Sequence, residues 1–504
     1  MNPKLKSTTA AAAGAEPTRD PARVVTASGP VRGTVTDAVR TFQGIPYAAP
    51  PVGDLRWKAP QPVADWTSDL DATKPGHACA QPTDQPIGVP GGQEDCLYLN
   101  VTTPTTVDGD LPVIVFIHGG SLVYGDGAGY GAEKLAARGK AVVVTINYRL
   151  GAFGFLSHPD LDATANLGLQ DQQAALEWLR HNASAFGGDR HNITIMGESG
   201  GGYSVCAHLY APGSRGLFDK AIVHSAGCVG SDDAAITLKQ AQDNGRALAE
   251  RADCESDVDA CLRAKSTKDL LAASESGHSG YRLVVDGDVL PESPAEALTS
   301  GRFSHVPVLY GANRDEESLR VAGAELANGP LTADGYIQQV TDAFGARADR
   351  VLAEYPLSSY GSPSEALTAV MTDSQWARPT FAAQTAVAQR NPVYAFEIAG
   401  TAPGFQGFPP VSFPLGTGHM SELAYFFDLK LFTPLTSEQE ELSDTLIDYW
   451  SSFARNGRPH ADKAPKWMEF GGDRPFTMRL SREGIGGVDY AAEHHVEFWK
   501  RLNG

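Results

Sequence analysis

Unbroken apolar runs recur along the chain, and each ends in glycine or a polar turn. Such runs are typical of strands that are buried on both faces, and these strands belong to parallel sheets covered by helices. The runs lie at residues 111–120, 140–149, 192–201, 220–227, 305–317 and 392–400.

Between these runs the apolar positions follow a helical spacing instead. Residues 169–186 (LQDQQAALEWLRHNASAF) show this spacing and end directly before Gly187 and Gly188. Strand and helix patterns alternate through most of the chain, which predicts a doubly wound α/β sheet. Residues 321–380 are mixed and mainly helical, and they fall between two predicted strands. An α/β enzyme places substrate-covering insertions at such a point.

The first 100 residues follow a different pattern. Residues 24–53 alternate in strand fashion with glycine punctuation and no helical signal, so we expect a small antiparallel sheet that leads into the main one. No linker divides the chain, which predicts a flexible tail over 1–24 and a single domain over 25–504. The tail lacks the apolar core of a signal peptide. It is either simply flexible or the start of a mature chain whose export signal is absent from this sequence.

Charge excludes two classes of partner. The 504 residues include 41 Lys and Arg against 60 Asp and Glu, a net charge of −19. A field of that sign repels nucleic acids and anionic membrane surfaces. No apolar run reaches the roughly 18 residues that a membrane span needs. We therefore expect neither of them as a partner. The expected partner is a small molecule, which the charge does not identify, and the expected oligomeric state is a monomer.

Six cysteines occur in an order that allows three neighbouring pairs. An even number arranged in this way favours disulfides and an oxidising compartment, whereas the alternative is six buried thiols in a cytosolic protein. No CxxC or Cys/His cluster has the spacing of a zinc site, so we expect no metal. The cysteines are Cys79, Cys96, Cys206, Cys228, Cys254 and Cys261.

Residues 197–201 (GESGG) match G-x-S-x-G around Ser199. The motif directly follows an apolar strand pattern (NITIM) and precedes a helical one (YSVCAHLYA). A nucleophile elbow needs this context, because its strained serine requires small neighbours at a sharp strand-to-helix turn. The alternative is a structural turn rich in small residues.

A serine nucleophile needs a base and an acid, which follow it in the order Ser, Asp/Glu, His in this type of fold. Residues 313–317 (NRDEE) place three carboxylates just after a predicted strand, although a solvated acidic loop would look the same. His419 lies in a small-residue loop after the next strand, and the pair His494 and His495 in a polar helical tail is the runner-up. Residues 118–121 (HGGS) follow another strand and are candidates for the oxyanion-binding N–H groups of Gly119, Gly120 and Ser121.

From about residue 25 to the C-terminus the chain resembles the type-B carboxylesterases, the family that includes the cholinesterases, and it looks like a member of the bacterial type. The resemblance implies an α/β-hydrolase fold and the hydrolysis of carboxylic esters. It rests on the segments FQGIPYAAPPVGDLRW, EDCLYLNV, NYRLGAFGFL, NLGLQDQQAALEW, FGGDRHNITIMGESGGG, NRDEE, GTGHMSELAYFF and YWSSFARNGRP.

Carried over position by position, the resemblance makes Ser199 the nucleophile, His419 the base and Glu316 the acid. It assigns the oxyanion donors to Gly120, Ser121 and Gly200. Three positions depart from the family pattern. The family commonly has Gly or Ala at 121, Ala at 200, and Gly at 317, directly after the acid, where this chain has Glu317.

Further roles follow from the same resemblance. Ser225 matches a supporting serine near the triad, and Glu198 matches a buried acidic neighbour. Arg56 and Glu94 match a structural ion pair. The pairs Cys79–Cys96 and Cys254–Cys261 match two recurrent disulfides, and Cys206–Cys228 would form a third. We therefore expect a secreted or extracytoplasmic protein, with a cytoplasmic one as the alternative.

The implied reaction is acyl transfer to water with neither a metal nor an organic cofactor. The alternatives are a same-fold hydrolase acting mainly on amides, carbamates or lactones, and a non-catalytic adhesion-type relative. A cholinesterase is not expected, since 84–93 (DQPIGVPGGQ) lacks the aromatic residue that holds the quaternary ammonium. Tyr124, Trp376 and Phe413 are equally candidates for a substrate pocket and for the core.

Overall fold

An eleven-stranded sheet forms the centre of the computed structural model, which describes residues 20–503 except 84–88, 107–108, 162–164, 230, 232–233, 276–279 and 473–474. Most of the expected N-terminal tail, residues 1–19, lies outside the described residues. The strand order is β16-β15-β14-β13-β10-β9-β7-β8-β6-β4-β3. The strands are β3 (Thr34–Val35), β4 (Val39–Pro46), β6 (Tyr98–Pro104), β7 (Leu111–Ile117), β8 (Val142–Ile146), β9 (Gly188–Glu198), β10 (Lys220–His224), β13 (Val308–Asn313), β14 (Val393–Ile398), β15 (Thr477–Ser481) and β16 (Gly484–Val488).

All neighbouring strands from β8 to β15 in this order pair in parallel, and antiparallel strands flank them at both edges. The prediction of a large, mostly parallel sheet is therefore confirmed. The carboxyl ends of the parallel strands share one edge of the sheet. Loops that follow β7, β9, β13 and β14 consequently meet there, which is where open α/β sheets place their active sites.

Side chains of β7 show why these strands read as unbroken apolar runs. All seven residues of β7 are buried. Val113, Val115 and Ile117 enter one hydrophobic core, whereas Ile114 and Phe116 enter a second core on the opposite face. Because successive side chains of a strand alternate between faces, a sheet covered on both sides needs apolar residues at every position.

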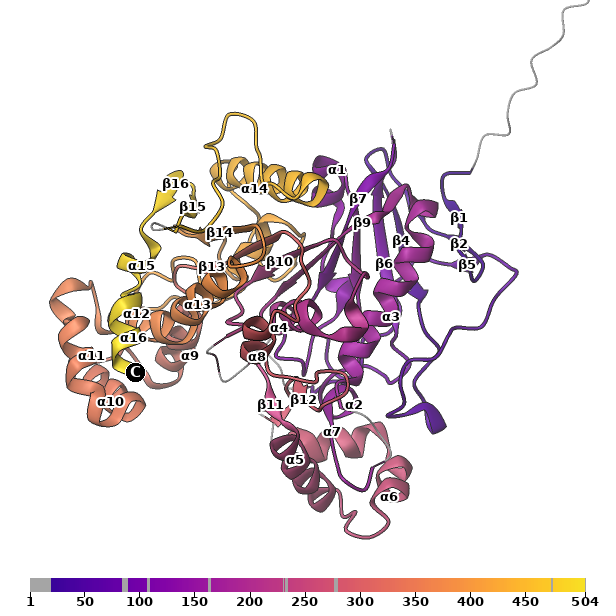
Figure 1. The fold of residues 1–504 in the computed structure, drawn as a ribbon, viewed down its shortest axis with the longest axis horizontal. Helices are drawn as coiled ribbons and strands as arrows, with labels where there is room; N and C mark the ends of the chain where they lie inside the picture. The colour runs from indigo at the N-terminus through magenta and orange to yellow at the C-terminus, as the bar shows by residue number, and fades with distance from the viewer. Residues whose placement is uncertain are drawn as a thin grey trace, which may run out of the picture.

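Helices cover both faces of the sheet (Figure 1). Helices α1 and α14 pack on the second core, and α3 and α4 pack on the first. The helices are α1 (Glu133–Gly139), α2 (Gly151–Phe155), α3 (Leu167–Asn182), α4 (Gly200–Tyr210), α5 (Leu238–Arg251), α6 (Val258–Ala264), α7 (Thr267–Glu275), α8 (Pro294–Ser300), α9 (Ser318–Asn328), α10 (Ala333–Phe344), α11 (Ala348–Glu354), α12 (Pro363–Thr372), α13 (Arg378–Val387), α14 (Ser437–Asn456), α15 (Tyr490–Glu493) and α16 (Val496–Asn503).

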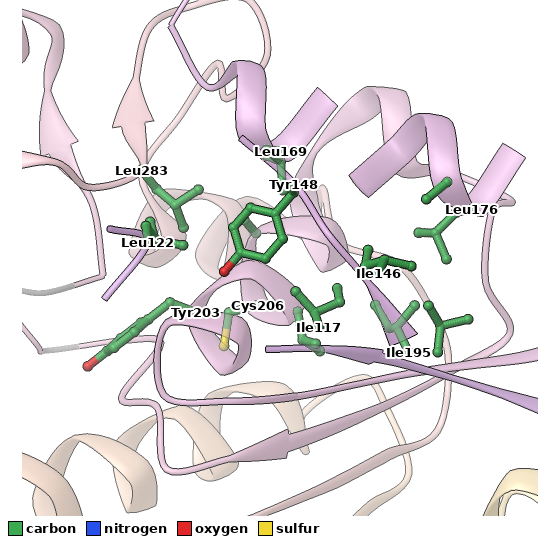
Figure 2. Packing of buried hydrophobic residues seen from close by; sticks show 14 of the residues in the cluster. Ile117, Leu122, Ile146, Tyr148, Leu169, Leu176, Ile195, Tyr203, Cys206 and Leu283 are labelled. Atoms are coloured by element: carbon green, nitrogen blue, oxygen red, sulfur yellow. The ribbon is translucent and has the colours of Figure 1, made fainter. Parts of the chain in front are cut away.

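The first core joins the central strands to the helix that was predicted from residues 169–186 and is observed as α3. Figure 2 shows this packing around the aromatic ring of Tyr148. Each labelled residue belongs to the first core. Because Tyr203 and Cys206 of α4 are among them, the helix that follows Ser199 packs on the same apolar layer. The labelled residues of strands β7, β8 and β9 are Ile117, Ile146 and Ile195, and those of α3 are Leu169 and Leu176.

The N-terminal part forms a separate three-stranded sheet, as expected. Strand β1 (Arg23–Val25) pairs antiparallel with β2 (Pro30–Arg32). A further strand, β5 (Leu70–Asp71), joins β2 in parallel and was not anticipated. β3 and β4, which follow in the chain, enter the main sheet at its edge.

The mixed segment 321–380 is helical, as predicted, and forms α9 to α12 between β13 and β14. These helices share a third hydrophobic core with the C-terminal helix α16. A second helical insertion, α5 to α8 with the short strands β11 (Ile236–Thr237) and β12 (Val284–Val285), follows β10 and was not predicted.

Candidate active site

Ser199 occupies the sharp turn between β9 and α4. Its backbone angles are φ 54° and ψ −120°, a strained conformation for any residue other than glycine. The turn also admits no side chain at two neighbouring glycines: a Cβ on Gly197 would lie 2.2 Å from the carbonyl oxygen of Gly201, and one on Gly201 would lie 1.9 Å from that of Ile117. Ser199 is half-buried, although the residues on both sides of it are buried. This is the geometry of a nucleophile elbow.

His419 and Glu316 lie together on the loops that follow β14 and β13. Nδ1 of His419 is 2.6 Å from Oε2 of Glu316, and the amide of His419 donates to the carbonyl oxygen of Glu316 at 3.1 Å. The other carboxylate oxygen of Glu316 accepts hydrogen bonds from the Ser225 hydroxyl at 2.5 Å and from the Asn313 amide at 2.8 Å. Glu316 is thus buried, held in place from both sides and able to orient the imidazole.

The other imidazole nitrogen faces the elbow. Nε2 of His419 lies 3.3 Å from Oε1 of Glu198, the residue directly before Ser199. Within the described residues, the Ser199 hydroxyl makes no hydrogen bond. In the absence of substrate, catalytic hydrogen bonds of this kind are often long and tighten only when the reacting group binds. The arrangement places a base, an acid and a free hydroxyl at one point above the sheet.

Electrostatic interactions at this point favour the protonated imidazole. Burial lowers the pKa of His419, but the negative charges of Glu198 and Glu316 outweigh burial and raise it to about 10. Burial raises the pKa of Glu198 above its usual range, and the positive charge of His419 opposes this rise. The base therefore gains proton affinity from two carboxylates of the site.

The loop that follows β7 approaches the elbow with its backbone. Its N–H groups at Gly120 and Ser121, together with that of Gly200, donate to no acceptor within the described residues. A Cβ on Gly119 would lie 3.2 Å from the Ser199 Cβ, so this loop runs beside the serine. Unpartnered N–H groups next to a nucleophile are what an oxyanion hole requires.

His118 anchors this loop. Its ring stacks on Tyr148 at 4.5 Å, and the Tyr148 hydroxyl donates to the His118 carbonyl oxygen at 2.8 Å. Burial lowers the pKa of His118 to about 4, so the ring is neutral. Its Nδ1–H donates to the carbonyl oxygen of Gly119 at 2.9 Å. The sequence pattern identifies His118 only as part of the HGGS motif, whereas the structure gives its side chain a positioning contact.

A buried polar network next to Ser199 and His419 was not predicted. The Trp450 indole N–H donates to Nε2 of His224 at 2.9 Å, so Nδ1 of His224 carries the proton and donates to Glu422 at 3.1 Å. The Asn313 side chain binds the other oxygen of Glu422. The carbonyl oxygen of His224 accepts the amide of Ser199 at 3.1 Å, which links the network to the elbow. The sequence contained one signal for this network, namely Glu422, an acidic residue three positions after His419.

The remaining candidates divide between site and core. Trp376 and Tyr124 are half-buried, and the Trp376 ring lies against His419. Phe413 is buried in the third hydrophobic core. His494, the alternative base, is also buried and contacts Asp373 and Glu397 at 2.5 Å each. It therefore belongs to a buried ionic cluster. Residues 84–88, part of the segment without aromatic residues, lie outside the described residues.

All six cysteines form disulfides in the expected pairs, Cys79–Cys96, Cys206–Cys228 and Cys254–Cys261. The second pair joins the elbow helix α4 to the segment that follows β10. The ion pair of Arg56 and Glu94 that the family resemblance implies is present as well.

Among the helices of the described chain, none combines the length and the apolar character that a membrane span requires. In the same residues no group of His, Cys, Asp and Glu side chains has the arrangement of a metal site.

Comparisons with known proteins extend over almost the whole chain. The family model described as "Carboxylesterase family" matches residues 20–499. The para-nitrobenzyl esterase of Bacillus subtilis (strain 168) is 35% identical over 480 residues, which cover 91% of this chain and 95% of that protein. The cocaine esterase of Homo sapiens is 32% identical over 92% of this chain and 87% of its own length. The pyrethroid hydrolase Ces2a of Mus musculus is 34% identical over the same shares.

Proposed function

Because the chain belongs to the carboxylesterase family and is a carboxylic ester hydrolase, we propose that Ser199, His419 and Glu316 carry out the hydrolysis. The observation that carries this proposal is the 2.6 Å contact between His419 Nδ1 and Glu316 Oε2, beside the strained serine turn. Family membership defines the reaction class, whereas this contact points to the residues that perform it.

In the first half of the reaction, the Ser199 hydroxyl attacks the ester carbonyl carbon while Nε2 of His419 takes its proton. Glu316 accepts the Nδ1–H of the imidazolium and balances its charge. The carbonyl oxygen becomes an oxyanion, and the N–H groups of Gly120, Ser121 and Gly200 stabilise it. Each such donor contributes a factor of about 10²–10³ to the rate.

The tetrahedral intermediate then collapses. The bond to the leaving alcohol breaks, and His419 gives its proton to the alcohol oxygen. A water molecule enters, His419 takes a proton from it, and the resulting hydroxide attacks the acyl-serine. When this second intermediate collapses, His419 returns the proton to Ser199, and the carboxylic acid leaves.

Two neighbouring residues support these steps in the proposal. The Ser225 hydroxyl fixes the carboxylate of Glu316 from the side opposite the imidazole. Glu198 contributes a buried negative charge 3.3 Å from Nε2 of His419, which strengthens the base. Because both residues act through a member of the triad, we expect their variants to be impaired but active.

A rapid-mixing experiment tests the assignment. The relative from Bacillus subtilis is named for para-nitrobenzyl esters, so a para-nitrophenyl ester, an aryl ester with the same nitro-substituted ring and a coloured leaving group, is a suitable first substrate. We expect wild-type protein to release one equivalent of the chromogenic alcohol in a burst, and Ser199→Ala to release none. An undiminished burst in Ser199→Ala would refute the assignment. A panel of para-nitrophenyl esters graded by acyl length then defines the acyl preference.

We also propose that residues 25–504 form one domain and that the protein is a secreted monomer. The first part of this proposal is supported by strands from both ends of the chain that share the main sheet. Three disulfides support the oxidising compartment. Light scattering after gel filtration measures the mass of the particle, and a thiol count on unreduced protein tests the disulfides. Six free thiols would contradict a secreted protein.

A further inference from the structure

Glu317, which replaces the glycine common in the family, is not a solvated charge. It is buried, and its Oε1 accepts a hydrogen bond from the indole N–H of Trp376 at 2.7 Å. Its other oxygen is paired with the Arg320 guanidinium. The indole and the guanidinium thus satisfy both oxygens of a carboxylate that stands next to the catalytic acid in the chain.

Trp376 in turn lies on the catalytic base. Its ring centroid is 4.6 Å from that of His419, with 43° between the planes. Trp376 belongs to a π-helical turn, Asp373–Ala377, between α12 and α13. Such turns are rare and frequently occur at functional sites. Because Trp376 is only half-buried, part of its surface remains open beside the triad.

We propose that Glu317 is a positioning residue, which holds Trp376 against His419 so that the indole stabilises the imidazolium formed during catalysis. The inference rests on the proposed function, because it requires His419 to be the base. The two adjacent carboxylates then have complementary roles. Glu316 binds Nδ1 of the imidazole, and Glu317 fixes the indole that lies tilted against it.

The physical basis is the attraction between a cation and the face of an aromatic ring. Tryptophan is the strongest aromatic partner for a cation, and the attraction acts within about 6 Å of the ring centroid. In the reacting form of the enzyme His419 is neutral, and it becomes a cation when it accepts the serine proton. The contact therefore stabilises the transition state more than this reacting form. Pairing with Arg320 offsets the charge of Glu317, which leaves Glu316 as the acid that binds Nδ1 of His419.

A purely structural role for Glu317 is the competing explanation. Its amide N–H donates to the Thr372 hydroxyl at 3.1 Å, which ties the acid loop to α12. That contact uses the backbone and survives any change of side chain. A variant that alters only the carboxylate therefore separates the two explanations.

A double-mutant cycle tests the proposal on the intact enzyme. We expect Glu317→Ala to lower kcat/KM on its alkaline plateau by about 3- to 30-fold, the range of a partly desolvated cation–π contact. In a Trp376→Phe background, which lacks the indole N–H, the same change should cost less than about twofold. Glu317→Gln, whose amide oxygen still accepts this N–H, should retain activity within about twofold of wild type.

The pH profile supplies a readout that a purely structural role would not move. Loss of the ring contact destabilises the imidazolium, so the acid limb of kcat/KM should move to lower pH in both Glu317→Ala and Trp376→Phe. The matched control is Glu325→Gln, a buried carboxylate on α9 that binds Ser364 and Ser412. We expect it to change stability and leave the pH profile in place.

Three results would overturn the inference: equal losses from Glu317→Ala in both backgrounds, an unmoved acid limb, or an inactive Glu317→Gln that is folded. If Glu317→Ala does not fold, the acid limb of Trp376→Phe decides alone. A turnover-competent Ser199→Ala would instead refute the proposed function. An inactive Ser199→Ala together with an additive cycle would refute only the role of Glu317.

Discussion

Replacing Gly200 with alanine restores the residue common in the family, yet we expect it to impair this enzyme. The new Cβ would lie 3.0 Å from the amide nitrogen of Ser121 and 3.0 Å from that of Leu122. Ordinary contact begins at about 3.4 Å, so the neighbouring backbone must move by a few tenths of an ångström. The atoms that must move belong to the loop whose N–H groups are proposed to bind the oxyanion.

This loop has little freedom to give way. Ser121 and Leu122 both have positive φ angles, 55° and 63°. The Leu122 carbonyl oxygen accepts the amide of Gly151 at 2.8 Å, and the Gly120 carbonyl oxygen accepts the amides of Val123 and Tyr124. A shift therefore breaks hydrogen bonds or carries the N–H groups away from the serine.

The expected fall in kcat follows from the contribution of one oxyanion donor to the rate. Complete loss of one oxyanion donor costs about 10²–10³ in kcat. A displacement of tenths of an ångström weakens that donor without removing it, so we expect kcat to fall by about 10- to 100-fold. KM should change little, because the oxyanion exists only in the transition state and the intermediates.

Steady-state kinetics with an aryl ester measure both constants, and the melting temperature verifies the fold. Gly323→Ala on α9 is the control for a general glycine-to-alanine effect, since its Cβ would meet nothing within 4 Å. Ser121→Gly should rescue Gly200→Ala in part, because glycine adopts a positive φ without a steric cost. A kcat for Gly200→Ala within twofold of wild type would refute the geometry, and so would the absence of any rescue.

Three further changes test other parts of the molecule. Glu198→Gln removes a negative charge that raises the pKa of His419 to about 10, so the acid limb of kcat/KM should move to lower pH; an unmoved limb contradicts the role of Glu198. Burial lowers the pKa of His494, but Asp373 and Glu397 raise it to about 10. The contribution of His494 to the free energy of unfolding is complete below about pH 6.5 and is lost as the pH rises toward 10. In urea unfolding, His494→Gln should therefore lose this decrease of stability between about pH 6.5 and 10. Replacing Cys206 and Cys228 with serine opens a loop with a sequence separation of 22 and should cost about 3 kcal/mol in the free energy of unfolding; unchanged stability contradicts a structural disulfide.

The fold and the proximity of Glu316 to His419 were predictable because their signals are local. A strand covered on both faces must be apolar at every position, so β7, β9 and β13 stand out along the chain. The strained turn at Ser199 requires small neighbours, which leave a visible motif. Glu316 and His419 follow buried strands at the same sheet edge, so their order along the chain implied that they meet.

Contacts between distant segments had no such signal. Trp376 binds a residue 59 positions earlier, and His224 contacts Trp450 from 226 positions away. No periodicity or spacing reports on pairs of this kind. His494 gives a similar case: its sequence neighbours are polar, yet it is buried between Asp373 and Glu397 because segments far apart in the chain enclose it. Side-chain partners of buried polar residues therefore required the structure.

The contacts of Gly200 and Glu317 explain why these two positions differ from the residues common in the family. Gly200 leaves room for a loop that carries Ser121 at a positive φ, and Glu317 supplies the acceptor for the indole of Trp376. Residues in direct contact contribute non-additively to stability and activity. Changing one member of such a pair toward the family residue should therefore harm the enzyme, whereas changing both should harm it less than the sum of the single changes. By this reasoning, residue choice at positions 121, 200 and 317 is set by local contacts of this chain, and family frequency is a poor guide there.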